Sequence, residues 1–343
     1  MRSLTLLTLT PVLLILTAPN AGALEASASQ RLRWTNDAFL GQDNQFSNGL
    51  TWQQFSAHGR TLEDTAGTPA FGKLLARPLL PRDRDLIYRE GWAVAHKIHT
   101  PDEMRRRDLT LDDVPYLGMV GWSNSFFAFD DHYFAGFEWL LGWVGDLTQA
   151  EPLHRLGHQI SGARRPRGWR HQLDNEPIFN LYYSRKYKFI KQNAFDAAMS
   201  FDAALGSYFT YGQAGIEMRF GRAPGGFAYV ANPVGKGLQY DATLRSEGST
   251  YTYVSLVTAV TWLLHAMPRD GNVLRRNNPW TQQNQVRPEP SIRRLIIGLH
   301  YERPRWSAHL HLWLGTDSVD PDTVVERLDT ANNFGALTLE RRL

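Results

Sequence analysis

The sequence predicts an all-β fold, a transmembrane antiparallel β-barrel of about twelve strands, and three observations support this fold class. An export signal opens the chain, apolar and polar residues alternate through most of the remainder, and aromatic side chains make up 12% of the residues. A β-barrel can use a length of 343 residues as one domain. The predicted organisation is therefore a signal peptide over 1–23 and one outer-membrane barrel with long external loops over 24–343.

The first element is the export signal. Arg2 supplies its positive charge, residues 4–17 form its apolar centre, and Ala21-Gly22-Ala23 is a small-residue cleavage site. The apolar centre is too short to span a bilayer as an anchor. We therefore expect the mature chain to begin near Leu24 and to lie outside the bacterial cytoplasm, in the outer membrane.

Alternation with a period of two predicts the strands that follow. In one run every second residue is apolar: Tyr133, Ala135, Phe137, Trp139, Leu141 and Trp143. The predicted strands lie near 30–38, 49–57, 87–98, 116–127, 132–146, 176–188, 194–205, 209–220, 249–266, 290–302, 305–316 and 333–343. A soluble periplasmic β-sandwich would also alternate, but the many Trp, Tyr and Phe residues on the apolar face favour a barrel. The long connection 58–86 is expected to be a surface insertion.

Composition limits the chemistry. The sequence contains no Cys, which excludes disulfides, thiol catalysis and thiolate metal sites. The formal net charge is only +3, and we expect no nucleic-acid partner. Two His residues in the predicted strand 305–316, His309 and His311, are expected to face the lumen as interior packing.

Three polar clusters follow the first, third and fifth predicted strands. Bacterial barrels keep both termini in the periplasm, so these three connections are predicted to lie together at the outer rim. The first cluster offers oxygen donors that suit Ca²⁺, unless it is only a solvated loop. Its members are Asn36, Asp37, Asp43, Gln45 and Ser47.

The other two clusters are basic. Arg105, Arg106 and Arg107 form the second, which is either a solvated loop or a phosphate-binding group. In the third, His154 and His158 have the spacing of a helical metal pair, but a zinc-protease motif would need Glu where Arg155 stands. A single His acting as a general base needs no such partner.

Serine chemistry is a second possibility. Ser47-Asn48-Gly49 resembles the serine motif of outer-membrane phospholipase A, in which the catalytic His stands two residues before the Ser. Here Gln45 occupies that position, which counts against this alternative. A porin or structural barrel without chemistry is the third possibility.

Several blocks of the sequence resemble the outer-membrane lipid A 3'-O-deacylase family. They are Asn36-Asp37, Phe46-Ser47-Asn48-Gly49, His99-Thr100-Pro101, Asp113-Val114-Pro115-Tyr116-Leu117-Gly118, His158 with Gly162, Gly168-Trp169, Gln172-Leu173, Asn175-Glu176, Asp270-Gly271-Asn272 and Phe334-Gly335. Together they extend over nearly all of the mature chain, in the family's order and spacing.

The resemblance implies a twelve-stranded barrel that hydrolyses the ester of the 3'-linked acyl group of lipid A in the outer leaflet. It implies Ca²⁺ near Asn36 and Asp37, His158 as the general base for water, and Ser47 as a group that orients substrate or water. The family has a Lys in the loop after the third strand, where this chain offers Arg106, with Arg105 beside it. We expect these two residues to bind a phosphate of the lipid A or lipopolysaccharide substrate, among other outer-membrane lipids.

Overall fold

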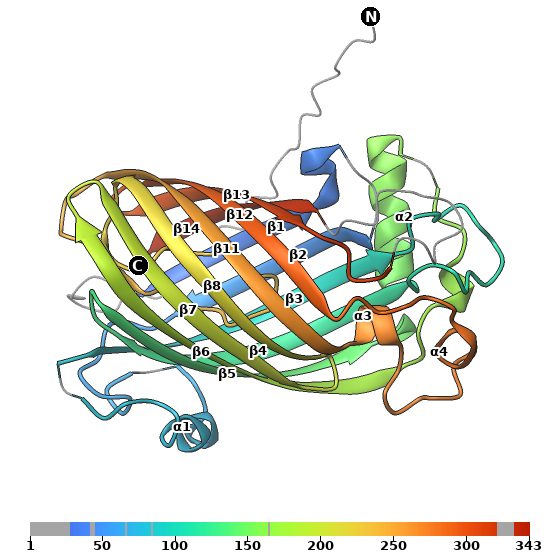
Figure 1. Ribbon diagram of the computed structural model, residues 1–343, viewed down its shortest axis with the longest axis horizontal. Helices are drawn as coiled ribbons and strands as arrows, with labels where there is room; N and C mark the ends of the chain where they lie inside the picture. Colours follow the sequence, from blue (N-terminus) through green and yellow to red (C-terminus); the bar gives the residue numbers. More distant parts are fainter. Residues whose placement is uncertain (1–27, 42–44, 66, 84, 164, 321–332) are drawn as a thin grey trace, which may run out of the picture.

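The computed structural model describes residues 28–41, 45–65, 67–83, 85–163, 165–320 and 333–343. The predicted export signal and Asp43 lie outside these residues. In the described part of the chain, twelve antiparallel strands close into a barrel, which confirms the predicted fold class (Figure 1). No helix among these residues is long and apolar enough to cross a membrane.

The barrel strands follow one another around the wall in chain order. They are β1 (Ser29–Asn36), β2 (Gln45–Phe55), β3 (Ile87–Thr100), β4 (Leu117–Phe129), β5 (Tyr133–Val144), β6 (Glu176–Gln192), β7 (Phe195–Gly206), β8 (Phe209–Arg222), β11 (Tyr251–Ala266), β12 (Ser291–Glu302), β13 (Trp306–Gly315) and β14 (Phe334–Arg342). Each corresponds to one predicted segment. β1 pairs with β14, with Ser29 opposite Arg342, and this pairing closes the barrel.

Alternation decides which face each side chain takes. On β1, Arg31 and Arg33 are buried in the lumen, whereas Leu32 between them is 48% exposed on the outer wall. On β13, His309 and His311 are fully buried, and His311 Nε2 lies 3.0 Å from the carbonyl oxygen of Tyr229 in the lumen. The prediction that these two His side chains face the lumen is confirmed.

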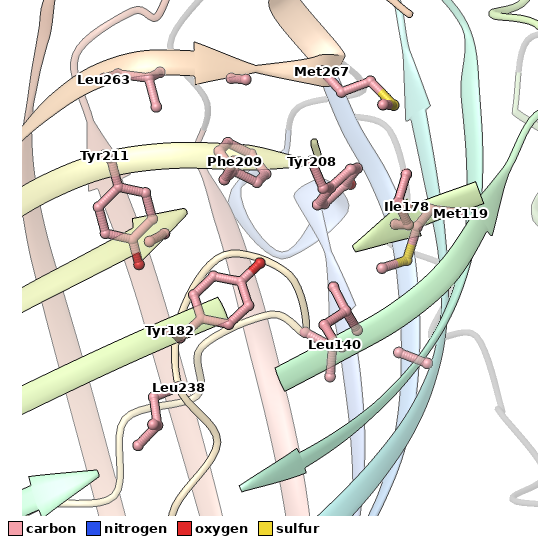
Figure 2. Packing of buried hydrophobic residues seen from close by; sticks show 14 of the residues in the cluster. Met119, Leu140, Ile178, Tyr182, Tyr208, Phe209, Tyr211, Leu238, Leu263 and Met267 are labelled. Carbon is pink, nitrogen blue, oxygen red and sulfur yellow. The ribbon is translucent and has the colours of Figure 1, made fainter. Parts of the chain in front are cut away.

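The connection between β8 and β11 folds back into the lumen and fills it. This plug, residues 223–250, contains the short strands β9 (Gly225–Gly226) and β10 (Thr243–Leu244). Figure 2 shows Leu238 of the plug among lumen-facing side chains such as Leu140 and Tyr182. The Tyr182 hydroxyl donates a hydrogen bond of 2.8 Å to the carbonyl oxygen of Gly235.

Buried charges fasten the plug to the wall. Asp241 is fully buried and accepts ion pairs from Arg31 at 3.0 Å and from Arg89 at 2.6 Å. Arg245, also in the plug, lies 3.5 Å from the same carboxylate. Since Asp241, Arg31 and Arg89 are shielded from water, the pairing is needed to hold their charges inside the barrel.

Helices and turns lie at the two ends (Figure 1). The outer end, where β1 finishes, carries α2 (Ala150–Ser161), α3 (Met267–Asp270), α4 (Pro279–Gln283) and 3₁₀ turns over Asp37–Leu40, Asp146–Thr148 and Trp169–His171. The inner end, where both β1 begins and β14 finishes, carries α1 (Ala70–Ala76). The predicted surface insertion 58–86 contains α1 and packs on the outside of the wall.

Candidate active site

The three polar clusters predicted from the sequence lie at the outer end of the barrel. They follow β1, β3 and β5, which all run toward that end. Backbone pairing brings the first cluster beside the second, because Gln45 of β2 pairs with Thr100 of β3. The second and third are joined by a hydrogen bond of 2.9 Å from the Arg167 N–H to the carbonyl oxygen of Met104.

Asn36 and Asp37 stand at the outer tip of β1. Asn36 takes the outward face of the wall, since Thr35 before it is buried in the lumen. Its side-chain oxygen accepts a 2.8 Å hydrogen bond from the Ala38 N–H and so caps the 3₁₀ turn. Asp37 opens that turn and is only 2% exposed. The backbone of Ser47 lies in β2, and its side chain is outside the described part of the structure.

Helix α2 packs on the outward face of β3 and β4. It approaches the wall at Gly118, where an added Cβ would lie 2.1 Å from Thr148 Oγ1 and 2.4 Å from Ala150 Cβ. His96, which faces outward on β3, has its Nε2 3.0 Å from the carbonyl oxygen of Thr148. The absence of a side chain at Gly118 therefore lets the start of α2 touch the wall.

The two His residues of α2 have different environments. His154 is 4% exposed, and its Nδ1 accepts a 3.1 Å hydrogen bond from Nε1 of the buried Trp169. Burial, together with nearby His158, lowers the pKa of His154 to about 3, so it is a poor proton acceptor near neutral pH. His158 is half-buried, and its ring centroid lies 4.2 Å from that of His154 in an edge-to-face contact.

Arg105 and Arg106 are exposed and paired with carboxylates of their own loop. Arg105 Nε lies 3.0 Å from Glu103, and Arg106 Nη1 lies 3.2 Å from Asp112. Exposed pairs of this kind contribute little to stability, typically about 0–1 kcal/mol. Both guanidinium groups can therefore exchange these partners for a phosphate.

Comparison with known proteins identifies the family to which the chain belongs. The family model described as "Outer membrane protein LpxR" matches residues 6–343. The chain belongs to the LpxR family. A search of curated protein sequences gives no match. The match confirms the resemblance to the lipid A 3'-O-deacylases, so the chain is an outer-membrane barrel of the lipid A deacylase family.

One solved structure shows the same fold. The structure of LpxR from Salmonella typhimurium matches with a TM-score of 0.69 at 12% identity, covering 91% of this chain and 99% of that one. The β domain of the Bordetella autotransporter BrkA matches with a TM-score of 0.43 at 7% identity, covering 92% of this chain and 98% of that one.

Several sequence blocks of this LpxR family member organise the outer loops. Both carboxylate oxygens of Glu176 accept backbone N–H groups from the connection after α3, namely Val273 and Leu274 at 3.0 Å and Arg275 at 2.9 Å. The side chain of Asn272 exchanges two hydrogen bonds of 2.9 Å with the backbone of Asp174. The sequence carried no sign of this role, because the partners are separated by about a hundred residues.

Proposed function

We propose that this chain is a Ca²⁺-dependent esterase that removes the 3'-linked acyl group of lipid A in the outer leaflet. The observation that carries the proposal is the position of α2, whose start packs on the outward face of the wall at the outer end and which carries His158 two turns further along. Asn36 takes the same outward face, so these groups are directed to the lipid and not to the plugged lumen. Family membership and the name of the matched structure, LpxR, support this reading.

Asn36 and Asp37 suit a calcium ion. An amide oxygen and a carboxylate are hard donors, and Ca²⁺ takes six to eight oxygen ligands. Asn36 and Asp37 would hold the ion through these oxygens. When bound there, Ca²⁺ supplies polarisation of the ester carbonyl and stabilises the charge that develops on its oxygen.

His158 has the role of the general base. Its imidazole takes a proton from water, and the water oxygen attacks the acyl carbon. The bond from that carbon to the sugar oxygen then breaks, and the imidazolium returns its proton to the sugar oxygen, so that a fatty acid and a free hydroxyl are released. His154 does not serve, because burial keeps its pKa near 3. It instead packs against His158, while the hydrogen bond from Trp169 holds its ring in place. Ser47 would orient the substrate or the water.

Arg105 and Arg106 would bind a phosphate of lipid A. A phosphate carries more charge than the carboxylates of Glu103 and Asp112, and a guanidinium matches it with two parallel hydrogen bonds. Arg106 stands where the family has Lys, so we assign it to substrate binding and not to proton transfer.

Mass spectrometry of lipid A from cells with and without the gene tests the proposal. We expect loss of one acyl chain from the 3' position when the gene is expressed. Unchanged lipid A together with released phospholipid fatty acids would instead support the serine esterase. The filled lumen argues against a porin, because a segment of the chain occupies the path that solute would take.

A further inference from the structure

The segment between β2 and β3 lies on the outside of the barrel at its inner end, away from the candidate active site (Figure 1). Its start pairs with the wall, where Gly59 forms a β-bridge with Tyr88. Its helix α1 touches the wall closely, because a Cβ added at Gly72 would lie 2.7 Å from the ring of Phe126 and 3.0 Å from Nε1 of Trp139. The wall and the helix therefore form one surface.

This segment covers a carboxylate that the alternation directs toward lipid. Glu90 faces outward on β3, next to the lumen-facing Arg89, yet it is only 1% exposed. It accepts hydrogen bonds from Thr65 Oγ1 at 3.0 Å and from the N–H and hydroxyl of Thr68 at 2.9 and 2.8 Å, and Lys73 Nζ lies 3.3 Å away. Burying a carboxylate in lipid costs free energy unless it is paired and hydrogen-bonded. The partners that the segment gives Glu90 therefore suit a position at the level of the membrane.

The face of α1 that points away from the wall is apolar. Three large side chains of the helix, and Leu79 shortly after its end, are exposed by 36–62%; those of the helix are Phe71, Leu74 and Leu75. They continue the lipid-facing surface of the barrel, because the Phe71 ring lies 6.0 Å from that of Trp139, which meets Trp122 at 4.7 Å. Trp122 is itself 37% exposed on the outer wall. The exposed face of α1 is thus contiguous with the surface that the outer membrane covers.

A cationic cleft adjoins this apolar face. The cleft has a volume of about 380 Å³ between α1 and the start of β3, and three guanidinium groups line it, those of Arg60, Arg77 and Arg82. Arg60 and Arg82 are exposed, and Arg77 pairs with Glu63 at 3.0 Å. Asp83 is the other carboxylate of the lining, which leaves the cleft net positive.

We propose that α1 and the cationic cleft beside it form a second lipid-binding site, specific for an anionic glycerophospholipid of the inner leaflet. The acyl chains lie along the apolar face of α1, and the phosphate lies among Arg60, Arg77 and Arg82. An amphipathic helix with basic residues at its border binds the membrane interface in this way. The site is independent of the proposed deacylase activity at the opposite end of the barrel.

The depth of α1 can be measured directly, because the sequence contains no Cys. A nitroxide label on Leu74→Cys is compared in vesicles of phosphatidylethanolamine and phosphatidylglycerol with labels at two control positions. Leu141→Cys lies on the lipid-facing wall, and Asn193→Cys lies in an exposed turn at the inner end. We expect the Leu74 label to match Leu141, accessible to oxygen and protected from a water-soluble nickel chelate. A label that matches Asn193, or one protected from both reagents by a protein contact, would overturn the proposal.

Headgroup selectivity is tested with Arg60→Gln/Arg82→Gln. The preference of the purified barrel for phosphatidylglycerol over phosphatidylcholine, measured by native mass spectrometry, should fall roughly fivefold for each arginine removed. The matched control is Arg303→Gln/Arg305→Gln, which removes the same charge from an exposed turn at the same end. An equal fall in both variants, or no fall in the first, would refute a specific site.

Discussion

The contact between α2 and the wall gives the sharpest prediction, for the substitution Gly118→Ala. The new methyl carbon would lie 2.4 Å from Ala150 Cβ and 2.1 Å from Thr148 Oγ1, whereas ordinary contacts begin at 3.4 Å. Thr148 cannot easily turn away, since its hydroxyl donates a 2.6 Å hydrogen bond to the carbonyl oxygen of Gly145. Relieving the clash therefore moves the start of α2 by about 1 Å, at a cost of about 1–3 kcal/mol.

His158 belongs to α2, the helix that has to move. A misplacement of about 1 Å can lower a catalytic rate roughly a hundredfold, so we expect Gly118→Ala to lose about that much lipid A deacylation in a mass spectrometric assay. The matched control is Gly157→Ala on the same helix, where an added Cβ meets nothing within 4 Å. Both proteins should fold, as shown by a gel-mobility shift on boiling. A folded Gly118→Ala protein with full activity would refute the role assigned to this contact.

Four further substitutions test the site and the plug. His158→Ala should lower turnover by about two to four orders of magnitude with the barrel still folded, and His154→Ala should lower it much less; full activity of folded His158→Ala would exclude it as the base. Asp37→Ala removes the one carboxylate of the proposed metal pair, so Ca²⁺ added after chelation should no longer restore deacylation as it does in the unaltered protein. Normal restoration would show that Asp37 is not a ligand. Asp241→Asn leaves the buried guanidinium groups around it without this carboxylate, and should lower the free energy of unfolding by about 3–5 kcal/mol in a urea titration. An unchanged unfolding midpoint would contradict the fastening of the plug by charge.

The strands could be predicted closely because lipid and lumen impose opposite demands on successive residues. The largest differences are four residues, at the start of β2 (45 against 49) and at the end of β6 (192 against 188). Strand direction alone then brought Asn36, Arg106 and His158 to one end of the barrel. A strand count is enough for this inference, since each additional strand reverses the direction of the chain.

The plug could not be predicted, because its burial depends on partners far away in the chain. Residues 223–250 show no period of two or of 3.6, and such a segment is usually a loop. Its Asp241 is buried only because Arg31 and Arg89 reach it from β1 and β3, more than 150 residues earlier. A charge with distant partners leaves no local pattern.

The packing of α2 on the outer wall also could not be predicted from the sequence. Gly118 belongs to one of the blocks shared with the family, but a residue without a side chain gives no indication of what approaches it. The helical spacing of His154 and His158 was recognisable, whereas the burial of His154 against Trp169 depends on how the loop after α2 returns to the wall. The sequence therefore indicated which residues share an end, and the structure adds that Asn36 and the start of α2 take the outward face.

The outward position of α2 determines which measure of lipid concentration should be used when catalytic rates are compared. The proposed site beside α2 meets its substrate in the plane of the membrane, so the variable that governs encounter is the mole fraction of lipid A in the leaflet or micelle. Inert detergent added at constant enzyme and lipid dilutes the surface without changing any bulk concentration. Rates from different preparations are therefore comparable only at equal surface composition.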